Sequence, residues 1–109
     1  MLFDFFSKAD INKGVEQFLS TPNAVLIDVR TPHEYREGHI PHSINIEAGS
    51  IRSARAILND LSTPIFVYCY SGARSSRAVS ALRAMGYTNV HNIGGISLYK
   101  GAAEKGEQQ

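Results

Sequence analysis

The sequence predicts an α/β fold with a parallel sheet, and three observations lead to this prediction. Residues 24–29 and 64–68 form two continuous apolar runs, which are typical of strands covered on both faces. Segments with helical spacing of apolar residues alternate with strand-like segments along the whole chain. The chain's one cysteine, Cys69, directly follows the second run. Because ligands meet the carboxyl ends of parallel strands, we expect Cys69 at the functional edge of the sheet.

The first half of the chain is expected to contain two helices and two strands. Apolar residues at helical spacing predict a helix over residues 10–20, and the first apolar run predicts a strand over residues 24–29. A short helix should begin after Thr31, because this capping residue is followed by proline and then, three residues after the cap, by Glu34. Residues 43–46 carry a weaker strand pattern.

The second half repeats this alternation of helices and strands. A helix is expected near residues 50–60, and the second apolar run predicts a strand that ends at Cys69. The helix that follows should end at Gly86, because glycine favours the left-handed conformation of a helix C-terminus. A short strand is expected near residues 89–92, and a last turn should follow Gly94-Gly95, where glycine permits a backbone turn.

Residues 1–109 are expected to form one domain, because this length supports one hydrophobic core and no linker interrupts it. Residues 1–6 are apolar but are interrupted by Asp4, and they lack the basic start of a signal peptide. We expect this segment to dock on the domain or, alternatively, to contact a partner. Residues 101–109 are rich in Ala, Lys, Glu and Gln and are expected to form a frayed tail.

The composition argues against several classes of partner and site. Eleven Lys plus Arg residues face 10 Asp plus Glu residues, a formal net charge of +1, so neither nucleic acid nor membrane is expected as a partner. A single cysteine forms no internal disulfide and indicates a reducing compartment, which predicts a cytoplasmic location. The histidines include no pair at i, i+4 spacing, so no metal and no cofactor are expected.

The strongest functional motif is the loop that follows the second apolar run. Its members are Cys69, Tyr70, Ser71, Gly72, Ala73, Arg74 and Ser75. A bent loop here directs backbone N–H groups inward, and the next helix points its positive end at the same place. Both effects favour a thiolate at Cys69, and Arg74 adds a permanent positive charge. Gly72 supplies the bend, and Ser71 and Ser75 can donate hydroxyl hydrogen bonds or cap the helix.

Cys69 and Arg77 each have a simpler, purely structural interpretation. A free cysteine is often an inert, buried residue, but the polar and cationic neighbours of Cys69 favour a reactive thiolate that faces an anion. Arg77 lies one turn beyond Arg74, so it either faces the same pocket as a possible anion contact or is a solvated helix residue. We expect these two outcomes equally.

Several motifs resemble those of the rhodanese-like family and follow one another in the same order. They are Asp28-Val29-Arg30, Glu34-Tyr35, Gly38-His39-Ile40-Pro41, the loop from Cys69 to Ser75, and Gly94-Gly95. The resemblance implies a five-stranded parallel sheet with helices on both faces and sulfur transfer through a persulfide on Cys69. It also implies that Asp28 and Arg30 brace the loop and the adjoining turn. Glu34 is expected to complete the helix cap or to pair with Arg30, and His39 is expected to cap or pack.

The sequence departs from the usual family pattern at two positions. His42-Ser43 stands where the family usually has Gly-Ala, which questions the turn geometry at this point. Tyr99 takes the place of a common tryptophan, and we expect it to fill the core in the same way.

The loop length separates two enzyme classes that share this chemistry. Four residues lie between Cys69 and Arg74, whereas phosphatases with a cysteine nucleophile resemble one another in having five. The shorter loop favours a sulfurtransferase over a phosphatase or an arsenate reductase. The expected reaction moves a sulfane sulfur from thiosulfate, a polysulfide or a persulfide to cyanide or a thiol. The alternative is a sulfur carrier or binding module that serves a protein acceptor and turns over little with free small molecules.

Overall fold

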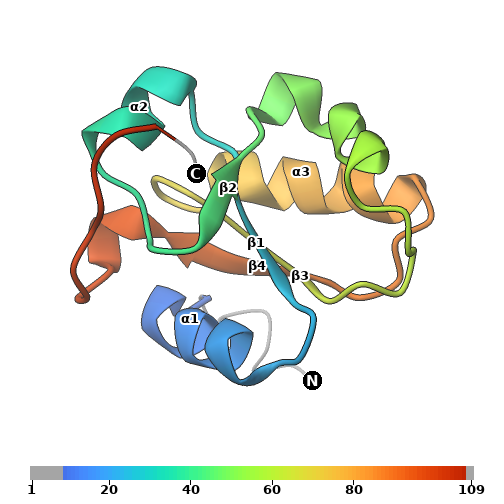
Figure 1. Cartoon of the computed structure of the whole chain (residues 1–109), viewed down its shortest axis with the longest axis horizontal. Coiled ribbons are helices and arrows are strands. Elements are labelled where there is room, and N and C mark those ends of the chain that lie inside the picture. Colours follow the sequence, from blue (N-terminus) through green and yellow to red (C-terminus); the bar gives the residue numbers. More distant parts are fainter. Residues whose placement is uncertain (1–8, 108–109) are drawn as a thin grey trace.

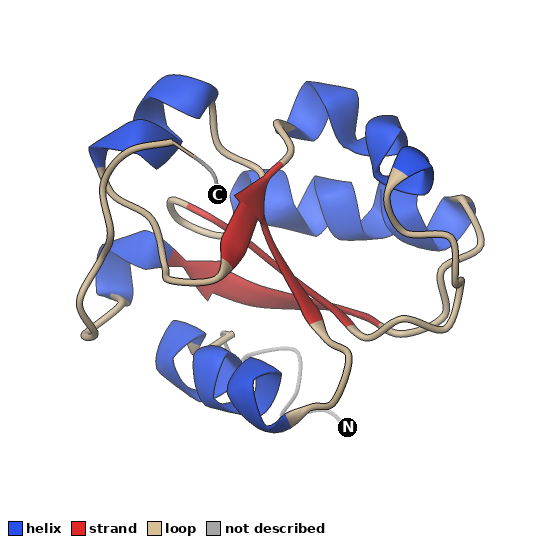
Figure 2. Cartoon of the chain, in the orientation of Figure 1, coloured by secondary structure: helices blue, strands red, loops and turns tan. Residues whose placement is uncertain are grey.

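The computed structural model describes residues 9–107 and contains a parallel sheet with helices on both faces (Figure 1). Its strands are β1 (Val25–Asp28), β2 (Ser43–Asn45), β3 (Ile65–Cys69) and β4 (Val90–Gly95). They lie in the order β2-β1-β3-β4, and every neighbouring pair is parallel. The predicted α/β class is therefore confirmed, and Figure 2 shows the strands enclosed between helices.

The helical segments cover the two faces of the sheet unequally. They are α1 (Ile11–Ser20), α2 (Pro32–Glu37), the 3₁₀ segment η2 (Ala48–Ala56), α3 (Ala73–Ala84) and the 3₁₀ turn η3 (Ile96–Leu98). In Figure 1, α1 lies below the sheet, whereas η2 and α3 lie above it. No helix in the described part of the chain is long and apolar enough to cross a membrane.

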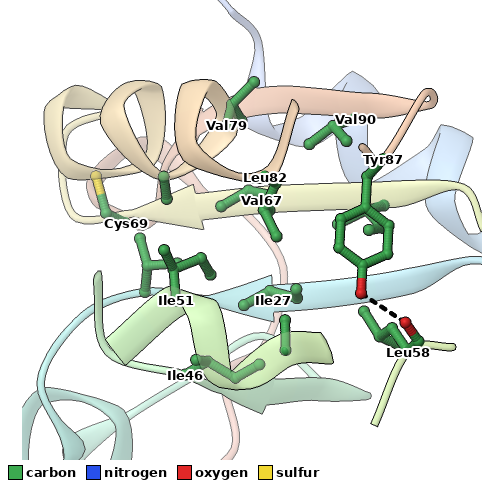
Figure 3. Close-up of a cluster of buried hydrophobic side chains, with 14 residues drawn as sticks. Ile27, Ile46, Ile51, Leu58, Val67, Cys69, Val79, Leu82, Tyr87 and Val90 are labelled. Atoms are coloured by element: carbon green, nitrogen blue, oxygen red, sulfur yellow. Dashed lines mark hydrogen bonds between the residues drawn. The ribbon is translucent and has the colours of Figure 1, made fainter. Parts of the chain in front are cut away.

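Alternate residues of each strand point to opposite faces, so the sheet has a hydrophobic cluster on either side. Ile27, Val67 and Cys69 belong to the larger cluster, which lies between the sheet and the pair η2 and α3 (Figure 3). Leu26 and Tyr68 belong to the smaller cluster, which packs against α1. All five residues of β3 are buried, as expected for a central strand covered on both faces.

The sheet has four strands in residues 9–107, so the expectation of five is wrong for this part of the chain. The fifth strand came from the family resemblance, whereas the apolar patterns along the sequence predicted these four. One further β contact joins His39 to Glu104 in antiparallel fashion. Because it pairs a single residue on each side, it does not add a strand to the sheet.

The predicted helix near residues 50–60 is a 3₁₀ segment over Ala48–Ala56, with a kink at Ser50 (φ −114°, ψ 18°). Gly49 and Ser50 are both poor formers of an α-helical interior, which explains the difference. The helix that begins after Thr31 is confirmed, with both halves of its capping box present. The Thr31 hydroxyl accepts from the Glu34 amide at 3.2 Å, and the Glu34 carboxylate accepts from the Thr31 amide at 2.9 Å.

The C-terminal segment differs from the frayed tail that its composition suggested. The amides of His39 and Glu104 donate to one another's carbonyl oxygens at 2.7 and 2.8 Å, and the Gly106 amide donates to Arg36 at 2.9 Å. These bonds hold residues 104–106 beside α2. The polar side chains of this segment face solvent, while its backbone groups find hydrogen-bond partners. Residues 108–109 lie outside the described part of the chain, and so does the apolar segment of residues 1–6.

Candidate active site at the Cys69 loop

The loop between β3 and α3 turns sharply at Gly72, as the sequence predicts. Cys69 is the last residue of β3, and Ala73 is the first residue of α3. Gly72 has φ 104° and ψ −10°, a left-handed conformation that side chains rarely adopt. The turn places the first amides of α3 opposite the end of β3. In Figure 3 the Cys69 sulfur points toward the first turn of α3.

The Cys69 sulfur lies inside a ring of hydrogen-bond donors. The amides of Gly72 and Ser75 approach Sγ at 3.0 and 3.4 Å, and the Ser75 hydroxyl lies 3.4 Å away. Burial alone would raise the pKa of the Cys69 thiol. The hydroxyl of Ser75 and the amides of Ser75, Gly72 and Ser71 outweigh this effect, so the pKa is lowered from its ordinary value. The loop therefore favours the thiolate.

Ser75 is fully buried and connects the sulfur to β4 through Asn92. Its hydroxyl lies 2.7 Å from Asn92 Oδ1 and 3.0 Å from the Gly72 carbonyl oxygen. A hydroxyl has one proton, so it cannot donate to the thiolate and to Asn92 at once. When Cys69 carries the thiol, Ser75 can donate to Asn92 and accept from S–H; when Cys69 is ionised, Ser75 can turn its proton toward the sulfur.

The sequence analysis missed Asn92, which supports the loop. Asn92 Oδ1 also accepts from the Gly94 amide at 3.0 Å, and its Nδ2 donates to the Gly72 carbonyl oxygen at 3.2 Å. The side chain therefore joins the bend of the loop to the end of β4. One signal in the sequence could have identified Asn92: it is a polar residue in a strand pattern that leads to a glycine pair. A half-buried amide at such a place needs hydrogen-bond partners.

The glycine pair after Asn92 lies at the end of β4 and allows two segments to approach closely. A Cβ atom at Gly95 would lie 2.0 Å from the Tyr70 carbonyl oxygen and 2.6 Å from Ser71 Cα. Gly94 has φ 105°, a conformation that favours glycine. The Ser97 amide also donates to the Tyr70 carbonyl oxygen at 3.1 Å. The first half of the loop therefore rests directly on the end of β4.

Arg74 pairs with Glu34 of α2 across the end of the sheet. Its two guanidinium nitrogens donate to the two carboxylate oxygens at 2.7 and 3.0 Å. The bidentate contact with Arg74 is the main reason why the pKa of Glu34 is lowered to about 2. The expected cap role of Glu34 is confirmed, but its ion-pair partner is Arg74 and not Arg30. The physical reason is that Arg30 is already bound elsewhere.

Arg30 forms a buried pair with Asp28 at the end of β1. Its Nη2 lies 2.8 Å from Asp28 Oδ2 and donates to the Gly38 carbonyl oxygen at 2.7 Å. Asp28 has no exposed surface and also accepts from the Arg30 amide at 2.9 Å. This pair braces the turn that ends α2, and α2 in turn carries Glu34. Asp28 and Arg30 therefore contact the turn that ends α2, whereas Glu34 makes the direct contact with Arg74.

The remaining candidates lie at the rim of the site. Tyr70, Ser71 and Ala73 are exposed, and Tyr70 retains 55% of its accessible surface. Arg77 is exposed but lines the same cleft as Arg74, which supports the interpretation that both face one pocket. Residues 9–107 contain no group of three or more potential metal-ligating side chains.

The two departures from the family pattern have clear places in the structure. His42 has φ 72°, so a histidine adopts the left-handed turn that a glycine would adopt without strain. Tyr99 packs against the smaller cluster, as expected for a core aromatic. His39 stacks on Tyr35 with ring centroids 3.7 Å apart, so its expected packing role is confirmed.

Comparison with known proteins identifies the family. A model of the rhodanese-like domain matches residues 12–102. This chain belongs to the rhodanese-like domain family. It is similar to an Escherichia coli rhodanese solved with anions, with a TM-score of 0.71, 33% identity, and coverage of 76% of this chain and 99% of that one. The rhodanese-like fold is thus shown by sequence and structure together.

Relatives of this rhodanese-like chain carry more than one name. It is 36% identical over 89 residues to the thiosulfate sulfurtransferase GlpE of Pseudomonas syringae, covering 77% of this chain and 79% of that protein. It is 31% identical over 107 residues to the tRNA uridine(34) hydroxylase of Buchnera aphidicola, covering 88% of this chain. The match spans 34% of the hydroxylase, so the two proteins share one domain.

Proposed function

We propose that this chain is a sulfurtransferase that moves a sulfane sulfur from a small donor to a thiophilic acceptor through a persulfide on Cys69. The observation that carries the proposal is the ring of donors around Sγ, with the Gly72 and Ser75 amides at 3.0 and 3.4 Å. Such a ring favours an anionic sulfur at the end of a strand. Similarity to GlpE, which is named a thiosulfate sulfurtransferase, supports the same activity.

In the first half-reaction the Cys69 thiolate attacks the sulfane sulfur of thiosulfate, a polysulfide or a persulfide. A new S–S bond forms on Cys69 while the donor's S–S bond breaks. The donor's remaining part leaves with the electron pair of that bond, as sulfite when the donor is thiosulfate. Cys69 then carries Cys–S–S⁻, and the positive ends of the loop amides stabilise its charge as an oxyanion hole stabilises oxygen.

In the second half-reaction cyanide or a thiolate attacks the terminal sulfur of the persulfide. The S–S bond on Cys69 breaks, and its electron pair returns to Sγ as the thiolate. Because both half-reactions share one covalent intermediate, the kinetics should be ping-pong. Four residues separate Cys69 from Arg74, one fewer than in cysteine phosphatases, and this spacing supports sulfur over phosphate as the group transferred.

A sulfur carrier that serves a protein acceptor is the second candidate. Two exposed apolar side chains favour it. Tyr70, in the loop, retains 55% of its accessible surface, and Leu98, which lines a cleft together with Ser71 and Gly72, retains 71%. The chain has a single cysteine, so no second thiol of the same chain can displace the sulfur. Either an outside small molecule or the thiol of a partner protein must collect it.

One experiment separates these candidates. The reduced protein is incubated with thiosulfate, freed of excess donor by gel filtration, weighed by intact mass spectrometry and then treated with cyanide. We expect a mass increase of one sulfur atom and a burst of about one thiocyanate per chain. Cys69→Ser is the matched control and should neither load nor release sulfur. A folded wild-type chain that does not load would contradict the proposal, whereas a full burst with slow steady-state turnover would favour the carrier.

A further inference from the structure

A cleft of about 480 Å³ lies between η2 and α3, on the side of the sheet that carries the larger cluster. This volume is within the range of small-molecule sites. Its lining residues are Val29, Glu47, Ala48, Gly49, Ile51, Arg74, Arg77, Ala78 and Ala81. The cleft therefore has an apolar floor of aliphatic side chains and a charged rim.

This cleft is adjacent to the Cys69 loop. Arg74 belongs to the Cys69–Ser75 motif and also lines the cleft. Ile51 and Ala78 line the cleft and belong to the same buried cluster as Cys69. In Figure 3 the Ile51 side chain lies between η2 and β3. A small molecule in the cleft therefore lies beside the first turns of α3, next to Arg74 of the Cys69 loop motif.

Two opposite charges at the rim of the cleft have no partner among residues 9–107. Glu47 precedes η2, and Arg77 lies on α3. Both are exposed, and neither side chain forms a hydrogen bond or ion pair within the described part of the chain. They line one cleft without pairing with each other, whereas Arg74 beside them is held by Glu34. Glu47 and Arg77 are therefore available to a ligand.

We propose that this cleft binds an aliphatic amino-acid thiol as the sulfur acceptor. Arg77 binds the α-carboxylate, Glu47 binds the α-ammonium group, and the apolar floor contacts the methylene carbons. A zwitterion fits because the cleft offers one charge of each sign over an apolar surface. The inference rests on the proposed sulfurtransferase activity and names the acceptor that this site selects.

The transfer step follows from this placement. The bound thiol loses its proton to solvent, and its thiolate attacks the terminal sulfur of the Cys69 persulfide. The S–S bond on Cys69 breaks, and its electron pair returns to Sγ. The amino-acid persulfide leaves the cleft, and no external oxidant or reductant is required because sulfur passes from one thiolate to another.

Four thiols test the assignment, because they share a two-carbon chain on sulfur and differ in which charged groups that chain carries. L-cysteine has both groups, cysteamine lacks the carboxylate, 3-mercaptopropionate lacks the ammonium group, and 2-mercaptoethanol lacks both. The rate at which the loaded enzyme loses its persulfide is measured in a single turnover and divided by the thiolate concentration. We expect L-cysteine to react about tenfold faster than 2-mercaptoethanol, with the other two thiols between them.

Variants assign the two charges separately. Arg77→Gln should lower the rates of L-cysteine and 3-mercaptopropionate relative to 2-mercaptoethanol by about threefold to fivefold, as expected for one exposed charged contact. Glu47→Gln should do the same for L-cysteine and cysteamine. Arg52→Gln is the matched control, since Arg52 is an exposed residue of η2 that does not line the cleft, and it should leave all ratios unchanged.

The outcomes distinguish this inference from the proposed function. Equal thiolate-corrected rates for the four thiols, in a chain that loads sulfur and releases it to cyanide, would overturn the cleft assignment alone. A chain that never loads would overturn the proposed function and the acceptor with it. Titration with S-methyl-L-cysteine, which cannot accept sulfur, is an independent check by NMR. Saturable shifts at cleft residues would support the site, and their absence would overturn it.

Discussion

Two of the arginine–carboxylate pairs in residues 9–107 have similar lengths and opposite environments. Asp28 and Arg30 lie 2.8 Å apart with side chains that are 0% and 6% exposed, whereas Glu34 and Arg74 lie 2.7 Å apart and are 31% and 33% exposed. A buried pair cannot open without leaving a charge away from water. A pair at the surface can exchange its partner at small cost. The first pair therefore fixes the fold, and the second can respond to an anionic donor.

The largest expected effect comes from breaking the buried pair. Asp28→Ala should lower the free energy of unfolding by about 3–5 kcal/mol, because Arg30 would remain buried without its carboxylate. Urea unfolding followed by circular dichroism measures this change. The double variant Asp28→Leu with Arg30→Met is the matched control and should recover much of the loss. A decrease below about 1 kcal/mol for Asp28→Ala would show that burial does not distinguish the two pairs.

Opening the exposed pair should instead change activity. Arg74→Ala should lower kcat/KM for thiosulfate by about tenfold, since it removes the one loop cation that an anionic donor can meet. The free energy of unfolding should fall by less than about 1 kcal/mol. Arg74→Lys keeps the charge without the bidentate geometry, so its kcat/KM for thiosulfate should lie between those of the wild type and Arg74→Ala. An unfolding loss as large as that of Asp28→Ala would make Arg74 a fold-determining residue instead.

Removing the carboxylate of the exposed pair should have a smaller effect of opposite sign. Glu34→Gln keeps an acceptor for the Thr31 amide but frees the Arg74 guanidinium, so kcat/KM for thiosulfate should rise by about twofold to fivefold at low salt. The rise should shrink as the ionic strength increases. A decrease at every salt concentration would mean that Glu34 positions Arg74 for catalysis and does not compete with the donor.

The pH dependence of the exposed pair gives the smallest effect. The pKa of Glu34 is lowered to about 2 in the folded chain, below its ordinary value of 4.5. The stabilisation is therefore complete above the unfolded pKa and is lost as the pH falls toward 2. The difference in free energy of unfolding between wild type and Glu34→Gln should be below about 1 kcal/mol at neutral pH and should vanish in acid. A difference that persists in acid would assign the stabilisation to the uncharged hydrogen bonds.

Local patterns in the sequence predicted the features that depend on neighbouring residues. The strand before Cys69 and the capping box at Thr31 are encoded within a few positions, and both are present. The bend at Gly72 follows from the same local sequence. Such features depend on residues that are close in the sequence, so periodicity and residue type are enough to predict them.

The features that the sequence analysis missed join residues far apart in the chain. The bond between Ser75 and Asn92 and the pair of Glu34 with Arg74 depend on how β4 and α2 meet the loop. The C-terminal segment likewise pairs with His39, which lies far from it in the sequence. The composition of the C-terminal segment indicates that its side chains prefer water, but it does not indicate which backbone groups lie opposite the segment.

Because Cys69 is the only thiol and is buried, the rate at which it is labelled can be used to study opening of the loop. Cys69 retains 1% of its accessible surface, and the chain has no other cysteine to compete for a label. We expect a small alkylating reagent to reach Cys69 with little movement of the loop, and a bulky fluorescent maleimide to react only when the loop opens. The ratio of the two labelling rates therefore reports how often the loop opens, and it does so in the wild-type chain.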